Sequence, residues 1–599
     1  TPAVIVPGLI KECGKKGITS ALVLSAGFKE AGETGENLFR DLKAQAKEYG
    51  VRLIGPNCLG LITPAIGLNA TFAPAMPGPG RVAFISQSGA MGSAILDWAA
   101  EKNVGFSHFV SVGNMADVSF HQLIDYFGSD SRTACILIYM ESLVNARKFM
   151  SAARAFARSK PIVILKAGRS KEGARATFSH TGSMAGNDAV YDAAFHRAGV
   201  IRAGTVQQLF DCAQALAMQP LPAANRLAIV TNAGGPGILA TDWLIQRGGT
   251  LAALQPTVFT ELDEIMPAAW SRSNPLDILG DATPELYRAA LRACLNDLGV
   301  DGVLCILTAQ NMTNPTAFAQ VVVEESQKVK GKPVYAAWMG LRTVREGRNF
   351  LETNKIPWYP FPERAVEVFM KMANYRETLE LLHETPPDLP IDLHFHRDAA
   401  RKIVEKIRKK GRTELNESES KQLLACYGIP VNSGKTAKTE DEAAAFALEL
   451  GLPVVMKIES PDIWHKSDVN GVRLGLESES DVRRAYHSLL ENVQKKRPDV
   501  RIEGVSVEKM WDVQHELLIG AVKDAVFGPV IVFGLGGSAT EIWQDRAIAL
   551  PPLNLALAKH LIEGTKISHL LHGYRHLPAV PMEFLQNVLC RFAYFLMDF

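Results

Sequence analysis

Short, continuously apolar runs alternate with helix-like patterns over the first 370 residues, and this alternation limits the fold more than any other feature. A strand with one face in water alternates apolar and polar side chains, whereas a strand covered by helices on both faces is apolar at nearly every position. The runs therefore predict several doubly wound α/β units with parallel strands. They cover residues 21–25, 51–55, 81–86, 134–140, 161–166, 226–231, 302–307 and 333–338.

Two proline-containing joints divide the chain, at residues 218–222 and 385–390. Such joints are typical of domain boundaries, and a chain of 599 residues is too long for one hydrophobic core. A basic segment over residues 397–412 follows the second joint, and we interpret it as a linker helix. After residue 415 the sequence pattern changes, and amphipathic helices alternate with strands in a separate module. A polar loop lies at residues 460–472 of this module.

Composition excludes two classes of partner. The 64 basic residues are balanced by 63 acidic ones, so the excess of positive charge that would favour nucleic acid or an anionic membrane is absent. No run reaches the roughly eighteen apolar residues of a membrane span. The eight cysteines form neither a CxxC pair nor a zinc-binding pattern, so we expect buried thiols in a reducing cytoplasm.

A histidine stands in a loop of small residues that follows the predicted strand 161–166. Hydroxyl-bearing residues and glycines flank His180 on both sides, a setting in which backbone amides can approach a bound anion. A neutral imidazole displayed in this way can act as a nucleophile and carry a phosphoryl group. For an isolated histidine the commoner interpretation is an ordinary surface loop, so the hypothesis depends on the rest of the chain.

Two glycine-rich turns follow predicted strands and begin helices. Free N–H groups at a helix N-terminus bind anions, so two such turns in adjacent α/β units predict one shared phosphate site around His180. Tight packing is the alternative explanation of the glycines. The residues predicted to bind phosphate are Ser88, Gly89, Ser179, Gly234, Gly235 and Gly237.

Other polar residues at strand ends add to this site. Glu141 follows the strand 134–140, where its carboxylate could bond one ring nitrogen of His180 and fix the tautomer; a solvent-exposed glutamate is the alternative.

Ser25, Gly27 and Asn57 follow the first two strands and could line one edge of a nucleotide-like ligand. Turn chemistry alone explains these three residues nearly as well.

The C-terminal module contains a second set of candidates. Lys457 ends a predicted strand and Lys466 lies in the next loop, and paired ammonium groups suit nucleotide phosphates. His465 stands beside this cation and should stay neutral and nucleophilic. A salt-bridged loop is the alternative. Glu508 and Glu516 complete the predicted nucleotide site.

Three motifs in this order carry a resemblance: residues 179–183 (SHTGS), 232–237 (NAGGPG) and 462–469 (DIWHKSDV). The chain closely resembles the ADP-forming (NDP-forming) acyl-CoA synthetases, relatives of succinyl-CoA synthetase, in their fused-subunit arrangement. The resemblance covers essentially all of the chain. It implies an acetate–CoA ligase that interconverts acyl-CoA, phosphate and ADP with carboxylate, CoA and ATP, through an acyl phosphate and a phosphohistidine.

The resemblance also assigns roles. It makes His180 the phosphoryl carrier, Glu141 the residue that orients it, and His465 a second histidine that assists transfer to ADP in a remote ATP-grasp domain after a loop swing. It implies ATP or ADP, Mg²⁺ and coenzyme A as ligands, with CoA bound by Ser25, Gly27 and Asn57 and with no metal ligand assigned. It further implies a cytoplasmic homo-oligomer that acts on small molecules, without a nucleic-acid or membrane partner.

Finally, the resemblance predicts a multidomain α/β protein. Its parts are the end of a Rossmann-like CoA-binding domain (1–75), a flavodoxin-like domain with the phosphohistidine loop (76–220), a second flavodoxin-like CoA-ligase domain (221–385), a linker (386–412) and an incomplete ATP-grasp domain (413–599). The family's first strands and its late metal-binding segment have no counterpart here, so we expect a natural chain that is longer at both ends. The alternative is the acyl-CoA-sensing part of a protein lysine acetyltransferase. Some of those proteins have lost the loop histidine, so the presence of His180 favours a working synthetase.

Overall fold

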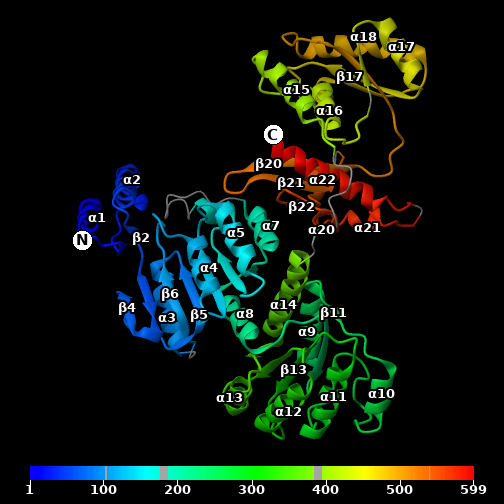
Figure 1. Cartoon of the computed structure of the whole chain (residues 1–599). Coiled ribbons are helices and arrows are strands. Elements are labelled where there is room, and N and C mark those ends of the chain that lie inside the picture. The colour runs from blue at the N-terminus through cyan, green and yellow to red at the C-terminus, as the bar shows by residue number, and fades with distance from the viewer. Residues whose placement is uncertain are drawn as a thin grey trace. The chain divides into compact units, whose positions relative to one another are not determined.

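The structure is a computed structural model that describes residues 1–101, 104–175, 187–383, 394–432, 434–463, 465–537, 540–575 and 577–599. His180 and Ser179 lie outside the described residues. The chain divides into two units (Figure 1). The first comprises Thr1–Glu384 with Asp524–Gly528, and the second comprises Thr385–Lys523 with Pro529–Phe599.

The first unit begins with a small parallel pair of strands. β1 (Ser20–Leu22) and β2 (Arg52–Ile54) lie side by side, as the apolar runs in this region predict. Helices α1 (Val6–Lys15) and α2 (Gly32–Glu48) pack against each other and enclose a core with Phe28 and Leu42.

A seven-stranded sheet follows, in the order β4-β3-β6-β5-β7-β8-β9. The strands β6, β5, β7, β8 and β9 are parallel, and β3 is antiparallel to both of its neighbours. β3 and β4 fall within residues 1–75, which the sequence assigns to the first domain, yet they extend this sheet. The strands are β3 (Gly60–Thr63), β4 (Leu68–Thr71), β5 (Pro79–Ser86), β6 (Phe106–Ser111), β7 (Cys135–Met140), β8 (Ile162–Lys166) and β9 (Ile201–Ala203).

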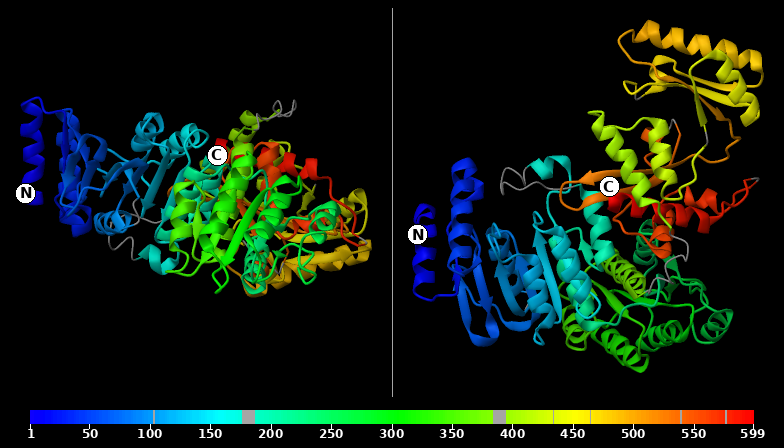
Figure 2. Two further views of the ribbon diagram at one scale, coloured as in Figure 1. Left: turned by 90° about the horizontal axis from the view of Figure 1, so that it is seen from below. Right: turned by 45° about the horizontal axis from the view of Figure 1, so that its top comes forward.

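Helices cover both faces of this sheet (Figures 1 and 2). Phe84 and Leu137 share one core with α3 (Gly89–Glu101) and α8 (Val206–Met218). Their sequence neighbours point to the opposite face, into a core shared with the helices α4 (Phe120–Ser129), α5 (Ala146–Phe156) and α7 (Asp188–Ala198). This two-sided burial confirms the interpretation of the continuously apolar runs.

The sequence gives no clear indication of β6, because polar residues interrupt its apolar pattern. Ser107 and Ser111 are nevertheless buried. The hydroxyl of Ser107 lies 2.8 Å from the hydroxyl of Thr133, and that of Ser111 accepts a hydrogen bond of 3.0 Å from the backbone of Leu59. Tertiary partners thus remove the cost of burying these hydroxyl groups.

The second sheet of the first unit is entirely parallel, in the order β11-β10-β13-β14-β15 with β12 beside β10. Its strands are β10 (Arg226–Thr231), β11 (Thr250–Leu251), β12 (Leu276–Asp277), β13 (Gly302–Thr308), β14 (Val334–Met339) and β15 (Trp358–Tyr359). One face is covered by α9 (Gly234–Gln246) and α14 (Pro362–His383), and its core is continuous with that of the first sheet.

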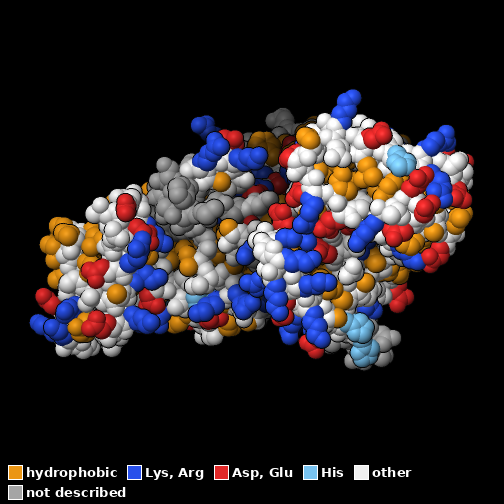
Figure 3. Space-filling view, turned by 90° about the horizontal axis from the view of Figure 1, so that it is seen from above, with side chains coloured by type: hydrophobic (Ala, Val, Ile, Leu, Met, Phe, Trp, Pro, Cys, Tyr) orange, Lys and Arg blue, Asp and Glu red, His pale blue; other side chains and the backbone are white. Residues whose placement is uncertain are grey.

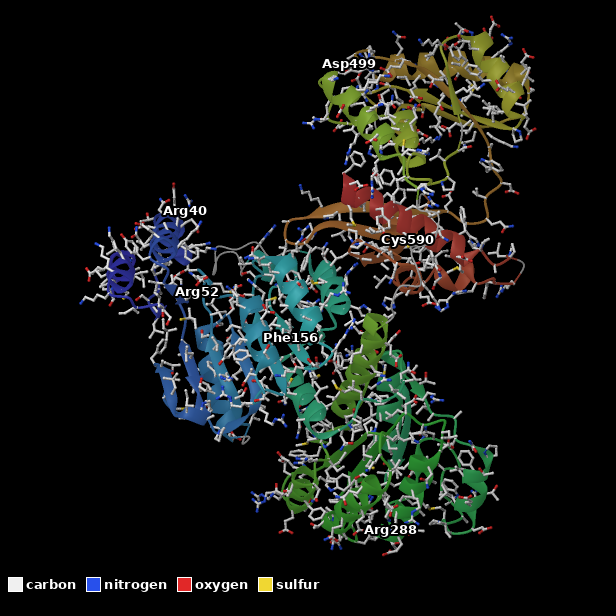
Figure 4. All side chains as sticks on the ribbon, in the orientation of Figure 1. Arg40, Arg52, Phe156, Arg288, Asp499 and Cys590 are labelled. Carbon is white, nitrogen blue, oxygen red and sulfur yellow. The ribbon has the colours of Figure 1, made fainter. Side chains whose placement is uncertain are left out.

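Four helices cover the other face of the second sheet. They are α10 (Pro256–Asp263), α11 (Pro284–Asn296), α12 (Pro315–Lys328) and α13 (Arg345–Thr353). Arg288 of α11, labelled in Figure 4, pairs with Glu325 of α12 at 2.9 Å and joins two of these helices. Arg292 and Lys328 contact the same carboxylate, and the hydrogen bond from Arg292 is the main cause that lowers the pKa of Glu325, to about 2.

Both large sheets share one strand order. Numbered along the chain with β12 left out, the parallel strands of each sheet run 2-1-3-4-5, the order of flavodoxin-like folds. In such sheets the connections leave the first and third strands in opposite directions, so a crevice opens beyond their carboxyl ends. The crevices lie at the ends of β5 and β7 in the first sheet and of β10 and β13 in the second.

The second unit contains an antiparallel sheet in the order β16-β19-β17-β18. Its strands are β16 (Gly434–Ala437), β17 (Val454–Glu459), β18 (Val472–Leu476) and β19 (Gly504–Lys509). The helices α17 (Glu440–Leu450) and α18 (Glu479–Lys496) share its core.

A three-stranded sheet, β20-β21-β22, follows in the chain. Cys590, labelled in Figure 4, is buried in its core. The strands are β20 (Leu517–Asp524), β21 (Gly528–Leu535) and β22 (Arg546–Ala549). The remaining helices of the second unit are α15 (Arg397–Lys409), α16 (Glu417–Ala425), α19 (Thr540–Trp543), α20 (Leu555–Glu563), α21 (Ser568–Leu571) and α22 (Met582–Asp598).

One prediction from composition has a structural counterpart, because all eight cysteines are free thiols and six of them are buried. On the face shown in Figure 3, basic and acidic side chains are interspersed. In the part of the chain that the structure describes, no helix combines the length and the apolar character needed to cross a membrane.

Candidate active site

The predicted residues of the first unit gather where β5 and β7 end side by side. The two strands are paired up to Ser86 and Tyr139. Directly beyond β5, the side-chain oxygen of Gln87 accepts hydrogen bonds from the backbone N–H groups of Glu141 (2.8 Å) and Ser142 (2.9 Å). Its amide nitrogen donates to the Ser142 hydroxyl at 2.8 Å. Gln87 therefore holds Glu141 against the turn that begins α3.

Ser88 and Gly89 form that turn. The Ser88 hydroxyl accepts a hydrogen bond of 3.3 Å from the N–H of Met91, and its carbonyl accepts one of 2.6 Å from the Ser86 hydroxyl. The N-terminus of α3 thus opens at the crevice, where its N–H groups and macrodipole favour an anion. The phosphate-binding role of Ser88 and Gly89 stays a prediction with this geometry behind it.

Glu141 has a cationic neighbour at the end of the next strand. The Glu141 side chain is buried. The cationic neighbour is Lys166, which ends β8 and pairs with Met140, the residue before Glu141. The Lys166 ammonium donates to the carbonyl of Ala167 and lies 4.7 Å from the centre of the Tyr191 ring. Burial is the largest cause that lowers the pKa of Lys166 to about 8, while the charges of Asp188 and Glu141 raise it.

The two ends of the predicted phosphohistidine loop are fixed at this same edge. Residues up to 175 leave β8, and residue 187 returns to α7. Asp188 joins the two stems, because Arg169 donates to its carboxylate at 3.2 Å and Arg202 pairs with the same carboxylate. A second hydrogen bond runs from Arg202 to the Asp188 carbonyl at 3.3 Å.

The second sheet repeats the Gln87 arrangement with an asparagine. Asn232 follows β10, and its amide nitrogen donates to the carbonyl of Thr308, at the end of β13, at 2.9 Å. Its oxygen accepts a hydrogen bond of 2.8 Å from the N–H of Thr308. Sequence reasoning missed this role of Gln87 and Asn232. The available signal was that a carboxamide directly follows β5 and β10, the first strand of the parallel part of each sheet.

The three predicted glycines at the start of α9 have different environments. A Cβ on Gly237 would lie 3.2 Å from Thr231 Cγ2 and 3.3 Å from Pro275 Cβ, so close packing explains this glycine. A Cβ on Gly234 would lie 2.9 Å from the Asp277 carboxylate. Gly235 faces open space and is the one of the three whose backbone a ligand can approach freely.

The residues predicted to bind CoA lie in adjacent turns. The N–H of Asn57, whose φ is +57°, donates to the Ser25 carbonyl at 2.9 Å. The Ser25 hydroxyl donates to the Thr1 carbonyl at 2.6 Å, and the Gly27 N–H donates to Glu30 at 2.6 Å. The structure brings the three residues together but gives each an internal hydrogen bond, so CoA binding by them stays a prediction.

In the second unit, one carboxylate gathers the predicted lysines. Glu417, in the first turn of α16, accepts hydrogen bonds from Lys457 at 2.8 Å and from Lys466 at 2.5 Å. Lys421, one turn further along the helix, lies 3.0 Å from the same carboxylate. The sequence did not predict Glu417 or Lys421, because nothing local indicates that α16 packs beside β17.

Glu508, from the neighbouring strand β19, completes the cluster. Its carboxylate pairs with Lys421 at 2.6 Å and with Lys457 at 3.3 Å, and it accepts a hydrogen bond from Asn432 at 3.3 Å. Burial opposes ionisation of Glu417, but the hydrogen bonds from Lys457 and Lys466 outweigh it and hold the Glu417 pKa well below its usual range.

His465 and Glu516 are placed differently from these lysines. His465 is exposed directly before Lys466, so the ion pair of Lys466 with Glu417 fixes the loop on which His465 stands. Glu516 precedes β20 in the other sheet, where its carbonyl accepts a hydrogen bond of 2.7 Å from Gly536. In the described part of the chain, no ion pair connects Glu516 with the lysine cluster.

A metal site is not evident at either location. The described residues contain no group of three or more His, Cys, Asp or Glu side chains that could hold a metal ion. A Mg²⁺ ion that is bound together with phosphate groups needs only one or two carboxylates from the protein. Binding of nucleotide phosphates by the lysines stays a prediction.

Comparison with known proteins identifies the family. Residues 79–216 match the succinyl-CoA ligase like flavodoxin domain, residues 227–381 the ligase-CoA domain and residues 406–599 the ATP-grasp domain. The acetate–CoA ligase [ADP-forming] I of Archaeoglobus fulgidus is 40% identical over 98% of this chain and 84% of its own length. The chain belongs to the ADP-forming acyl-CoA ligases. It is an enzyme of the acetate–CoA ligase type.

Two further relatives show the range of this family. The 4-hydroxybutyrate–CoA ligase [ADP-forming] of Nitrosopumilus maritimus is 34% identical over 95% of this chain and 82% of its own length. The structure of Ca. Korarchaeum cryptofilum dinucleotide forming acetyl-coenzyme A synthetase 1 in complex with phosphate and ADP is similar with a TM-score of 0.60 and 36% identity. That similarity covers 64% of this chain and 83% of the other.

The buried Lys166 of this ligase should give the stability a distinct pH dependence. Native Lys166 loses its proton near pH 8, whereas the unfolded chain keeps it up to about pH 10.5. Between these values the unfolded state binds more protons, so the wild type should gain stability relative to Lys166→Met, by up to about 3 kcal/mol.

Urea unfolding of the first unit at pH 7, 8, 9 and 10 measures this difference. The matched control is Lys148→Met, which removes an exposed lysine of α5. Its stability relative to the wild type should not change over the same range. A Lys166→Met difference that stays constant with pH would contradict the assignment.

Proposed function

We propose that this ligase interconverts acetyl-CoA, phosphate and ADP with acetate, CoA and ATP by carrying a phosphoryl group on His180. One observation supports this assignment above others: Glu141, the N-terminus of α3 and both stems of the His180 loop meet at the ends of neighbouring strands. An anion bound at α3 there would lie beside a buried carboxylate suited to holding an imidazole.

The first half of the reaction forms the phosphohistidine. Phosphate attacks the thioester carbonyl of acetyl-CoA, and the C–S bond breaks to release CoA thiolate. A ring nitrogen of His180 then attacks the phosphorus of acetyl phosphate, and acetate leaves with the electron pair of the broken P–O bond. Glu141 accepts the N–H of the other ring nitrogen, which keeps the attacking nitrogen unprotonated and stabilises the charge that develops on the ring.

The second half of the reaction belongs to the lysine cluster. Lys457 and Lys466 would bind the phosphates of ADP, since a carboxylate already holds their ammonium groups close together. A terminal oxygen of ADP then attacks the phosphorus of phosphohistidine, and the P–N bond breaks to leave neutral His180. His465, which stands beside Lys466, would assist this transfer. Mg²⁺ would enter with the nucleotide and neutralise phosphate charge.

The choice of acetate follows the relative with 40% identity, which is named for that substrate. A relative with 34% identity is named for 4-hydroxybutyrate, so the acyl group varies within this family. Acetyl-CoA and 4-hydroxybutyryl-CoA are therefore the pair of substrates to compare in the assay.

His180→Ala should abolish phosphoenzyme formation. Incubation of the purified protein with γ-labelled ATP and Mg²⁺ should label the wild type with a phosphoryl group that is stable in base and lost in acid, as expected for phosphohistidine. His196→Ala, in α7, is the matched control and should label like the wild type. Full labelling of His180→Ala would disprove the assignment.

Glu141→Gln should slow phosphorylation of His180 by about 10²- to 10⁴-fold, because a neutral amide stabilises the charged ring less. Quench-flow labelling from acetyl phosphate measures the rate. Unfolding by urea should remain close to that of the wild type, since the backbone N–H groups of residue 141 and Ser142 still donate hydrogen bonds to Gln87. An unchanged labelling rate would remove Glu141 from the mechanism.

His465→Gln should separate the two half-reactions. Labelling of His180 from acetyl-CoA and phosphate should proceed as in the wild type, whereas transfer of this label to ADP should fall by at least tenfold. Chase of the isolated phosphoenzyme with ADP measures the second step. If both steps slow equally, His465 does not act at the nucleotide.

A further inference from the structure

Glu417 brings together three cationic groups from three separate segments. Lys421 comes from the same helix, α16, Lys457 from strand β17, and Lys466 from the loop that carries His465. Its position in the first turn of α16 favours a negative charge, because the helix N-terminus is the positive end of the macrodipole. The carboxylate thus occupies a place suited to a bound anion.

The space around Glu417 is open enough for a ligand. Two cavities of about 200 Å³ and 350 Å³ adjoin it, and Glu417 and Glu459 line both. Lys421 and Glu508 line the first cavity, and Lys466 lines the second. Two of the three lysines that Glu417 pairs, Lys421 and Lys466, therefore line cavities that phosphate groups can enter.

The charges of the cluster are nearly balanced while Glu417 is ionised. The three lysines carry three positive charges, against the two negative charges of Glu417 and Glu508. Burial raises the pKa of the adjacent Glu459 above its usual value, which disfavours a further negative charge there. Without Glu417, Lys421 and Lys457 would keep Glu508 as an ion-pair partner, and Lys466 would have no ion-pair partner among the described residues, an arrangement that attracts an anion.

The three lysines differ in their ion-pair partners, and this difference determines which ion pair a bound phosphate can replace. Lys457 and Lys421 each pair with both Glu417 and Glu508. For Lys466, Glu417 is the one ion-pair partner among the described residues. An incoming polyphosphate can therefore take Lys466 from Glu417 while Glu508 still holds the other two lysines.

We propose that Glu417 is an internal counter-ion that the phosphate groups of the nucleotide replace. In the nucleotide-free protein Glu417 holds Lys466 and, with it, the loop of His465 against α16. Binding of ADP or ATP transfers Lys466 from the carboxylate to a phosphate oxygen and frees this loop. The inference rests on the proposed function, because it takes a nucleoside diphosphate or triphosphate as the ligand of the cluster.

The variant Glu417→Gln tests the exchange, because it removes the charge and keeps the size of the side chain. ADP no longer has to displace a carboxylate, so its dissociation constant should fall about tenfold. The melting temperature without nucleotide should fall, since the lysines lose their counter-ion, and saturating ADP should raise it by more than in the wild type. Isothermal titration calorimetry and thermal unfolding measure the two effects.

Two further variants serve as controls. Glu449→Gln removes an exposed carboxylate that pairs with Lys435 in the same sheet-and-helix region, and ADP affinity should not change. Glu417→Asp keeps the charge but shortens the side chain, so it contacts the lysines less closely. Its ADP affinity should lie between those of the wild type and Glu417→Gln, which keeps the test valid if Glu417→Gln does not fold.

The outcomes separate this inference from the proposed function. Unchanged or weaker ADP binding in both Glu417 variants, with normal binding by the wild type, would overturn the counter-ion role and leave the function intact. A wild type that binds neither ADP nor ATP would instead overturn the proposed function. Tighter binding in Glu417→Gln and Glu417→Asp, without an effect of Glu449→Gln, would support the exchange.

Discussion

The parallel pairing of β5 with β7 is the constraint on which the first site depends. It leaves the ends of two strands side by side at the point where the chain turns to opposite faces of the sheet. Gln87 spans the gap and fixes the backbone of Glu141. Lys166 ends the next strand, so the loop with His180 begins at this edge as well. A single strand order thus determines where the residues of the proposed phosphoryl site meet.

The second unit holds several lysines close together in the absence of a bound phosphate. Unpaired ammonium groups would repel one another. Glu417 and Glu508 counter this repulsion, and they raise the pKa of Lys457 against the influence of burial. In the proposed exchange, an incoming phosphate competes with a carboxylate that is already well bound.

Much of the fold could be predicted from local patterns, and some of the site could not. The continuously apolar runs predicted β5, β7, β8 and β10, because a strand that is buried on both faces is apolar at nearly every position. β6 was missed since its buried serines are satisfied by partners distant in the chain. The order of the strands, and so the neighbours of Glu141, has no local signature at all.

The sequence by itself determined which chemical groups are present: the loop histidine, the strand-end glutamate, the paired lysines and the order of motifs that indicates the family. Tertiary structure decided which of them meet. It placed Gln87 beside Glu141, closed the loop stems through Asp188, and brought Glu417 to Lys457 and Lys466 across 40 and 49 residues of chain. The physical reason is that side-chain type is encoded locally, whereas a hydrogen bond or ion pair requires two groups that only the completed packing brings within reach.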